Sequence, residues 1–161
     1  MNVLEVGAGD LKLANILLNK NIIPQISVVE KNIIPQNLNQ KIQFYEGFLE
    51  DISFNKKFDL IYSSHVFEHI DNIEKHFEKI LSVINTNGKL IISFPDFQYW
   101  ISNFYLNMFS QEHPIFPFID NVKFLFSKFG FNITKMQIFE NHSLFICAQL
   151  NNLKIDLNAK T

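Results

Sequence analysis

The sequence predicts an α/β fold in which helices cover a mostly parallel, doubly wound sheet. Two observations lead to this prediction. Short apolar runs with strand character alternate with amphipathic helical stretches along most of the chain. Near the C-terminus, two apolar runs are separated by only three residues, 140–142, and so short a connection forces an antiparallel hairpin.

Composition is that of one globular domain. The chain has 161 residues, 47% of them hydrophobic and 19% charged. We assign residues 1–150 to the domain and 151–161 to a polar tail. No segment approaches the roughly 18 to 20 consecutive apolar residues of a membrane helix, and the start lacks the pattern of a signal peptide. With Cys147 as the single cysteine, we expect a cytoplasmic protein with no membrane span.

The charge pattern argues against nucleic acid as a partner. The formal net charge is −2, and all 14 basic residues are lysines scattered along the chain. Arginine is the usual side chain for bidentate contacts to phosphates and base edges, and it is absent.

The first half of the chain predicts four strands and one helix. The helix is expected over 10–19, where leucines recur on one face, and 46–54 is expected to be a loop or a single helical turn. The expected strands are Val3–Val6, Ile26–Glu30, Lys41–Tyr45 and Phe58–Ser63.

The second half begins with the clearest helix, over 72–84. Its apolar residues fall on one face, His76 falls on the expected exposed face, and Asp71 with Glu74 forms a capping-box pattern. Asn87-Gly88 is expected to turn the chain into a strand over 89–94 that Pro95 ends.

The remaining elements complete the fold. Residues 96–118 are aromatic and have no clean period. A helix is expected over 119–129 with Gly130 as its C-terminal cap, followed by strands over 131–139 and 143–150.

A strand, a glycine turn and a helix N-terminus meet at the start of the chain. Gly7 and Gly9 follow the first strand, and they let the backbone turn sharply and approach a ligand closely. This arrangement favours a small polar ligand at the helix N-terminus. A glycine turn without any ligand is the alternative.

The ordered motifs of the chain, taken together, resemble those of class I S-adenosylmethionine-dependent methyltransferases from Val3 to Leu150. That resemblance implies a Rossmann-like sheet with a C-terminal antiparallel hairpin and S-adenosylmethionine as cofactor. The matching segments are residues 4–10 (LEVGAGD), 28–30 (VVE), 44–54 (FYEGFLEDISF), 58–70 (FDLIYSSHVFEHI) and 87–93 (NGKLIIS).

The resemblance also implies a set of cofactor-binding residues. Glu30 would accept hydrogen bonds from both ribose hydroxyls, since a carboxylate has two accepting oxygens. The loop at Gly47 would flank the adenine, and Glu5 would support the glycine turn. The full implied set is Glu5, Gly7, Ala8, Gly9, Asp10, Glu30, Lys31, Gly47, Phe48, Leu49, Ser63 and Ser64.

Three departures from the family pattern predict weak cofactor binding. Leu11 stands where a third glycine is usual, so either the turn differs or the helix begins earlier. Phe48 stands where an acid often lies. Members of the family usually carry helices before the first strand, and here these N-terminal helices are missing, as in a truncated or split gene product.

The expected activity is methyl transfer to a small-molecule acceptor, with His65, Asp96 and His113 as candidate bases near the ends of the fourth and fifth strands. The segment 110–116 (SQEHPIF) resembles that of methyltransferases acting on nucleotide-linked deoxysugars, in which the histidine serves as a base. That subgroup also has a zinc-binding segment, which one cysteine cannot build, so we expect no metal.

Several alternatives stay open. A nicotinamide-dependent dehydrogenase would need a third glycine where Lys12 stands. A non-catalytic domain of the same fold, acting as a partner subunit or an inert remnant, is the stronger rival. Glu68 and His69 are expected to form a local pair, and His76 and His142 to lie outside the site. The oligomeric state is left open.

Overall fold

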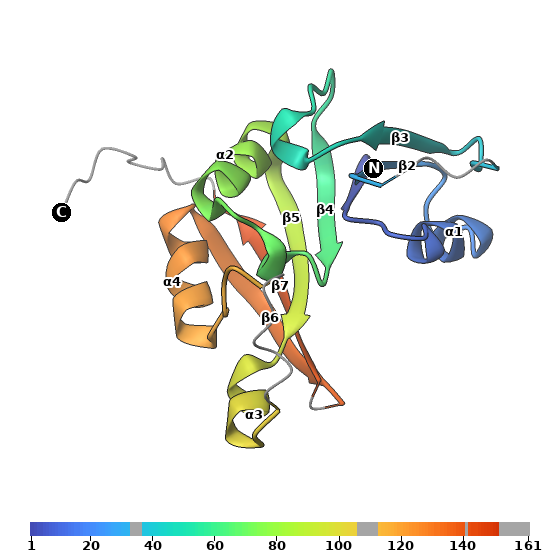
Figure 1. Cartoon of the computed structure of the whole chain (residues 1–161). Coiled ribbons are helices and arrows are strands. Elements are labelled where there is room, and N and C mark those ends of the chain that lie inside the picture. The colour runs from blue at the N-terminus through green and yellow to red at the C-terminus, as the bar shows by residue number, and fades with distance from the viewer. Residues whose placement is uncertain (33–36, 106–112, 141, 152–161) are drawn as a thin grey trace.

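The computed structural model describes residues 1–32, 37–105, 113–140 and 142–151. These residues form a seven-stranded sheet with the order β3-β2-β1-β4-β5-β7-β6. Strands β1 to β5 are parallel, and β7 runs antiparallel to both β5 and β6. The predicted fold class is confirmed, including the terminal hairpin (Figure 1).

The elements follow the expected order along the chain. The helices are α1 (Lys12–Asn19), α2 (Ile73–Val83), α3 (Phe97–Ser102) and α4 (Ile119–Lys128), with short 3₁₀ turns η1 (Leu49–Asp51) and η2 (Phe67–His69). The strands are β1 (Val3–Val6), β2 (Ile26–Glu30), β3 (Ile42–Glu46), β4 (Phe58–Ser64), β5 (Ile84–Pro95), β6 (Phe131–Phe139) and β7 (Ser143–Leu150).

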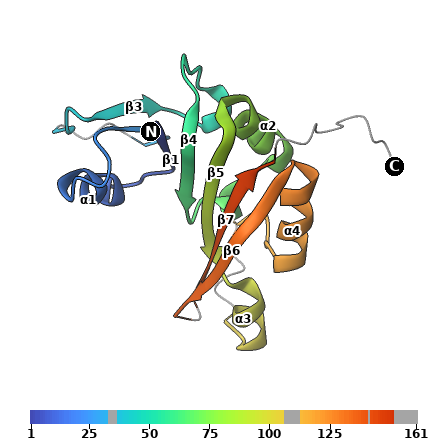
Figure 2. The same ribbon diagram turned by 180° about the vertical axis from the view of Figure 1, so that it is seen from behind.

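Two apolar cores lie on opposite faces of the sheet. Helix α1 buries Ala14 and Leu18 against β1, β2 and β3 on one face. Helices α2 and α4 cover the other face, where Phe77 and Phe126 lie in the larger core. Figure 2, seen from behind, shows α1 separated by the sheet from α2 and α4. The sheet therefore has its two faces covered, as a doubly wound fold requires.

Two local predictions were wrong, and one element was not predicted. Helix α2 is capped by the side chain of Asn72, which accepts a hydrogen bond from the Lys75 amide, and not by Asp71. Strand β5 begins at Ile84, because the expected turn at Asn87-Gly88 is a bulge within the strand, with Asn87 at φ 62°. A short helix, α3, lies in the aromatic segment that showed no period.

His76 is the clearest correction. It was expected on the exposed face of its helix, yet it is 5% exposed. The turn η1 packs over this part of α2, and the Glu50 carboxylate lies 2.6 Å from Nδ1 of His76. The hydrogen bond from His76 lowers the pKa of Glu50, and burial partly opposes this shift. Helical periodicity cannot reveal such a cover, because the cover comes from elsewhere in the sequence.

Among the described residues, the helices lack the length and apolar character that a membrane span needs.

The bounds of β3 and the cap of α4 were also predicted from the sequence. Strand β3 is shifted by one residue from the expected range, and Gly130 follows α4 with φ 74°, as a C-terminal cap.

Candidate functional site

A cavity of about 760 Å³ lies at the carboxyl ends of the central parallel strands. Its wall comes from the turn after β1, the end of β2, the segment after β3 and the segment after β4. Because the strand order reverses between β1 and β4, this edge is the topological switch point, where open α/β sheets bind ligands. A smaller cavity of about 270 Å³, at the opposite ends of β1 to β3, has no such relation to the switch point.

The glycine turn forms the floor of the cavity. Gly7 has φ 71°, and a Cβ there would stand 2.3 Å from Cγ2 of Val66, so the close packing of β1 against the segment after β4 requires glycine. Gly9 has φ 53°, and a Cβ there would meet no atom of the described residues within 4 Å. Since Gly9 lines the cavity, its backbone is exposed to whatever the cavity holds.

Glu30 fixes the geometry beside this turn. Its Oε2 accepts a hydrogen bond from the Gly9 amide at 2.8 Å, and its Oε1 accepts two from Asn32, at 3.0 Å each. The Glu30 residue is 6% exposed and lines the cavity. Each carboxylate oxygen can accept more than one hydrogen bond, so Glu30 has capacity left for a ligand.

The loop after β3 supplies the opposite wall. Gly47 has φ 131°, and its amide donates to the Glu30 carbonyl at 3.0 Å. Phe48 is 58% exposed and presents its ring at the cavity, with the Lys31 ammonium 6.0 Å from the ring centre. Leu49 is buried behind it. An exposed aromatic ring beside a cavity can stack against a planar ligand.

Five residues of the expected cofactor set support the cavity without lining it. Ala8 packs in the core under α1, Asp10 accepts from the Lys12 amide, and the Ser64 hydroxyl bonds that of Ser93. Ser63 and Glu5 are buried within β4 and β1.

Glu5 has an unusual titration. Burial raises the pKa of its carboxyl to about 7, with the charges of Asp10 and Glu30 acting in the same direction. The Tyr62 hydroxyl on the neighbouring strand opposes this shift. Below pH 7 the protonated form of this carboxyl predominates and adds no further negative charge beside Glu30.

His65 belongs to a polar chain at one side of the cavity. Its Nδ1 lies 3.3 Å from Oε1 of the buried Glu68, and its Nε2 lies 3.1 Å from the Ser143 hydroxyl. That hydroxyl also lies 2.7 Å from Nδ1 of His142, so the expected bystander His142 is joined to the same chain. His65 itself has φ 53° and lines the cavity.

The other two candidate bases lie differently. The Asp96 side chain accepts a hydrogen bond from the Tyr99 amide and caps α3. Asp96 does not line the cavity, so its role in the structure is to stabilise this helix. His113 does not line the cavity, but its neighbour Pro114 does, and its ring centre lies 4.9 Å from that of His69. Residues 110–112 of the expected Glu-His segment lie outside the described residues.

Sequence reasoning missed several residues that line the cavity. Asn32, two residues after Glu30, lines the cavity and is the easiest of these to predict. A polar residue just beyond an acidic strand end can be recognised in the sequence. His69 was expected to form only a local pair with Glu68, and it lines the cavity. His76 lines it as well, and no sequence signal placed it there.

Comparison with known proteins agrees with this architecture. A family model described as a methyltransferase domain matches residues 1–136. A curated relative, the ubiquinone biosynthesis O-methyltransferase of Rickettsia canadensis, is 25% identical over 99 residues. The alignment covers 58% of this chain and 42% of the relative, so it spans less than half of that protein's length.

Solved structures share the fold at low sequence identity. An S-adenosylmethionine-dependent methyltransferase from Mesorhizobium loti is 12% identical, with a TM-score of 0.71 over 92% of this chain and 90% of that one. The plantazolicin methyltransferase BpumL, solved in complex with SAH and a triazolic desmethylPZN analog, is 13% identical. Its TM-score is 0.76 over 94% of this chain and 77% of that one. On the family match and this fold, the chain belongs to the class I S-adenosylmethionine-dependent methyltransferases.

Proposed function

We propose that this chain binds S-adenosylmethionine in the 760 Å³ cavity and transfers its methyl group to a small-molecule acceptor. The observation that carries the proposal is the pairing of Gly9 with Glu30. The glycine backbone opens onto free space, and the carboxylate beside it has accepting capacity left. When bound, the cofactor supplies an activated methyl group on a sulfonium, which an acceptor nucleophile takes by direct displacement.

The residues of the cavity fit the parts of this cofactor. Glu30 suits a ribose, because its Oε2 accepts one hydrogen bond in this structure and has a second lone pair for a ribose hydroxyl. The other ribose hydroxyl would replace one of the two Asn32 donors at Oε1. The exposed ring of Phe48 suits the face of an adenine. The protonated form of Glu5, favoured up to a pH of about 7, limits the repulsion between this floor and a carboxylate of the cofactor.

The acceptor must lose a proton where its nucleophile is a hydroxyl or an ammonium. Of the three candidate bases, His65 and His113 are better supported than Asp96, whose carboxylate caps a helix. His65 lines the cavity, and the Glu68 carboxylate beside its Nδ1 would stabilise an imidazolium. Nucleotide-linked sugars are the acceptor class that the segment 110–116 favours.

Calorimetric titration with S-adenosylhomocysteine tests the cofactor site. We expect binding by the unchanged chain and a roughly 10- to 100-fold loss of affinity in Glu30→Gln, since a hydrogen bond to a charged group is worth about 1.5–3 kcal/mol.

Glu46→Gln is the matched control, because Glu46 pairs with Glu30 across β2 and β3 but does not line the cavity. Equal losses in both variants would contradict the role of Glu30. Absence of binding at millimolar ligand would overturn the proposal in favour of a non-catalytic domain.

A further inference from the structure

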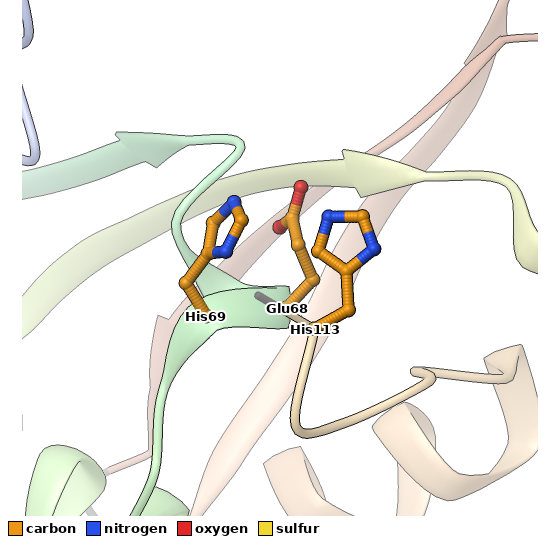
Figure 3. A group of neighbouring side chains, drawn as sticks. All are labelled: Glu68, His69 and His113. Atoms are coloured by element: carbon orange, nitrogen blue, oxygen red, sulfur yellow. The ribbon is translucent and has the colours of Figure 1, made fainter. Parts of the chain in front are cut away.

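Glu68, His69 and His113 form a compact cluster beside the cavity. One side-chain oxygen or nitrogen from each residue lies within 4.8 Å of the other two. Glu68 and His69 belong to η2 after β4, whereas His113 comes from the segment before α4. Figure 3 shows the Glu68 carboxylate between the two imidazole rings. The tertiary fold thus joins ligand atoms from two distant parts of the chain.

The burial of Glu68 needs an explanation. The residue is 1% exposed, and among the described residues its Oε2 has no hydrogen-bond partner. Its other oxygen, Oε1, lies near Nδ1 of His65. A buried carboxylate oxygen without a partner costs free energy unless a proton, a donor or a cation satisfies it. A buried carboxylate with such an oxygen, next to two imidazoles, is the chemical setting of a metal site.

We propose that Glu68, His69 and His113 bind one divalent transition-metal ion of the zinc class. Two imidazole nitrogens and one carboxylate oxygen form a ligand set that zinc uses in sites with an open position. Magnesium and calcium prefer oxygen ligands. Because two of the three proposed ligand atoms are nitrogens, neither is the ion that this site favours. The site contains no cysteine, so the argument from the single Cys147 against a zinc site does not apply to it.

The geometry requires a small closure of the cluster. Ligand atoms about 2.1 Å from a tetrahedral zinc lie about 3.4 Å apart, so separations of up to 4.8 Å must shrink by a little over an ångström. His69 is exposed and His113 is half-buried, so rotation of their side chains suffices. Glu68 is fixed by burial and serves as the anchor.

The ion would lie at the edge of the cavity, since His69 and Pro114 both line it. Its open position would take an oxygen of a hydroxyl- or carboxylate-bearing ligand, and a bound hydroxyl would lose its proton more readily. An imidazole that coordinates a metal has no lone pair left to accept a proton. Metal binding would therefore leave His65, and not His113, as the candidate base.

Cobalt(II) is the probe that tests this site, because its visible absorption bands report ligand number and type. We expect the metal-stripped chain, carrying no polyhistidine tag, to bind one equivalent of Co²⁺ with visible bands. Zn²⁺ should remove the bands, and excess Mg²⁺ should leave them unchanged. The bands should be lost in Glu68→Gln and in His69→Asn, and the second variant changes an exposed side chain.

His142→Asn and Cys147→Ser are the controls, since each removes one metal-binding side chain outside the cluster. Both should keep the bands. Absence of Co²⁺ binding, or its persistence in His69→Asn, would overturn the proposal. The metal titration needs no cofactor and the S-adenosylhomocysteine titration needs no metal, so failure of one proposal is distinguishable from failure of the other.

Discussion

Leu11 occupies a backbone conformation that usually belongs to glycine. Its φ is 61°, it precedes α1 as the N-cap residue, and its amide donates to the Ala8 carbonyl at 2.9 Å. The missing third glycine therefore leaves the turn in place, and the helix begins later than expected, at Lys12. The side chain compensates for the strain, because it is 2% exposed and packs in the core under α1.

Because burial of the Leu11 side chain offsets its backbone strain, we predict an unusual order of stability among variants at position 11. Leu11→Ala loses the buried side chain and keeps the left-handed conformation, so we expect a loss of about 3 kcal/mol in the free energy of unfolding. Leu11→Gly loses the same contacts but relieves a strain of about 1 kcal/mol. Urea unfolding should therefore rank glycine above alanine here, and the reverse order would contradict the strained conformation.

Glu5 predicts how stability depends on pH. Its pKa is raised from 4.5 to about 7 in the folded chain. Between these values the unfolded chain loses the proton while the folded chain keeps it, so stability falls as the pH rises through this window. The fall reaches about 3 kcal/mol above pH 7 and is absent below pH 4.5.

Urea unfolding at pH 5 and pH 8 measures this effect in the unchanged chain and in Glu5→Gln. The substitution should remove most of the difference between the two pH values. Glu46→Gln, at an exposed position of β3, should keep it. A fall of equal size in both variants would assign the pH dependence to other groups.

At the scale of elements, the start of α2 shows which of several suitable side chains caps the helix. Asp71, Asn72 and Glu74 all have side chains suited to a helix N-terminus, and the sequence favoured Asp71 through its spacing to Glu74. In the structure, Oδ1 of Asn72 accepts from the Lys75 amide at 3.0 Å. The chain path after η2 decides which residue has the extended conformation that capping needs.

We expect Asn72→Ala to lower the free energy of unfolding by about 1 kcal/mol, because one amide at the start of α2 loses its acceptor. Asp71→Ala should change it by less than about 0.5 kcal/mol, as an exposed substitution away from the cap. Thermal unfolding of the two variants side by side measures the difference. Similar losses in both would mean that the two residues share the cap.

At the scale of the whole molecule, the larger core lies between the sheet and helices α2 and α4. Phe77 is at its centre, 1% exposed, with its ring centre 4.9 Å from that of Phe129 and 5.5 Å from that of Phe126. This aromatic group joins α2 and α4 to the C-terminal hairpin through Phe131. It therefore joins helix α2 to the antiparallel end of the sheet.

Phe77→Ala should cost about 3–5 kcal/mol, since it opens a cavity that packed rings cannot fill. Leu13→Ala, at a position 40% exposed on α1, should cost far less. Urea unfolding compares the two. A cost below about 1 kcal/mol for Phe77→Ala would place the stabilising core elsewhere.

The fold class was predictable from the sequence, since periodicity, the glycine turn and the short link over 140–142 are local signals. The family resemblance also indicated Gly9, Glu30 and Phe48, which all line the cavity. These residues lie at or just after strand ends that meet at one edge of the sheet. Neither the burial of His76 nor the series of polar contacts from Glu68 through His65 to Ser143 was predictable from the sequence.

Only the tertiary structure brought His113 beside Glu68 and His69. These residues lie far apart in the sequence, and no periodicity links them. Their proximity depends on how the segment before α4 packs against η2. Local patterns fix which elements form, whereas contacts between distant elements depend on the three-dimensional path of the chain.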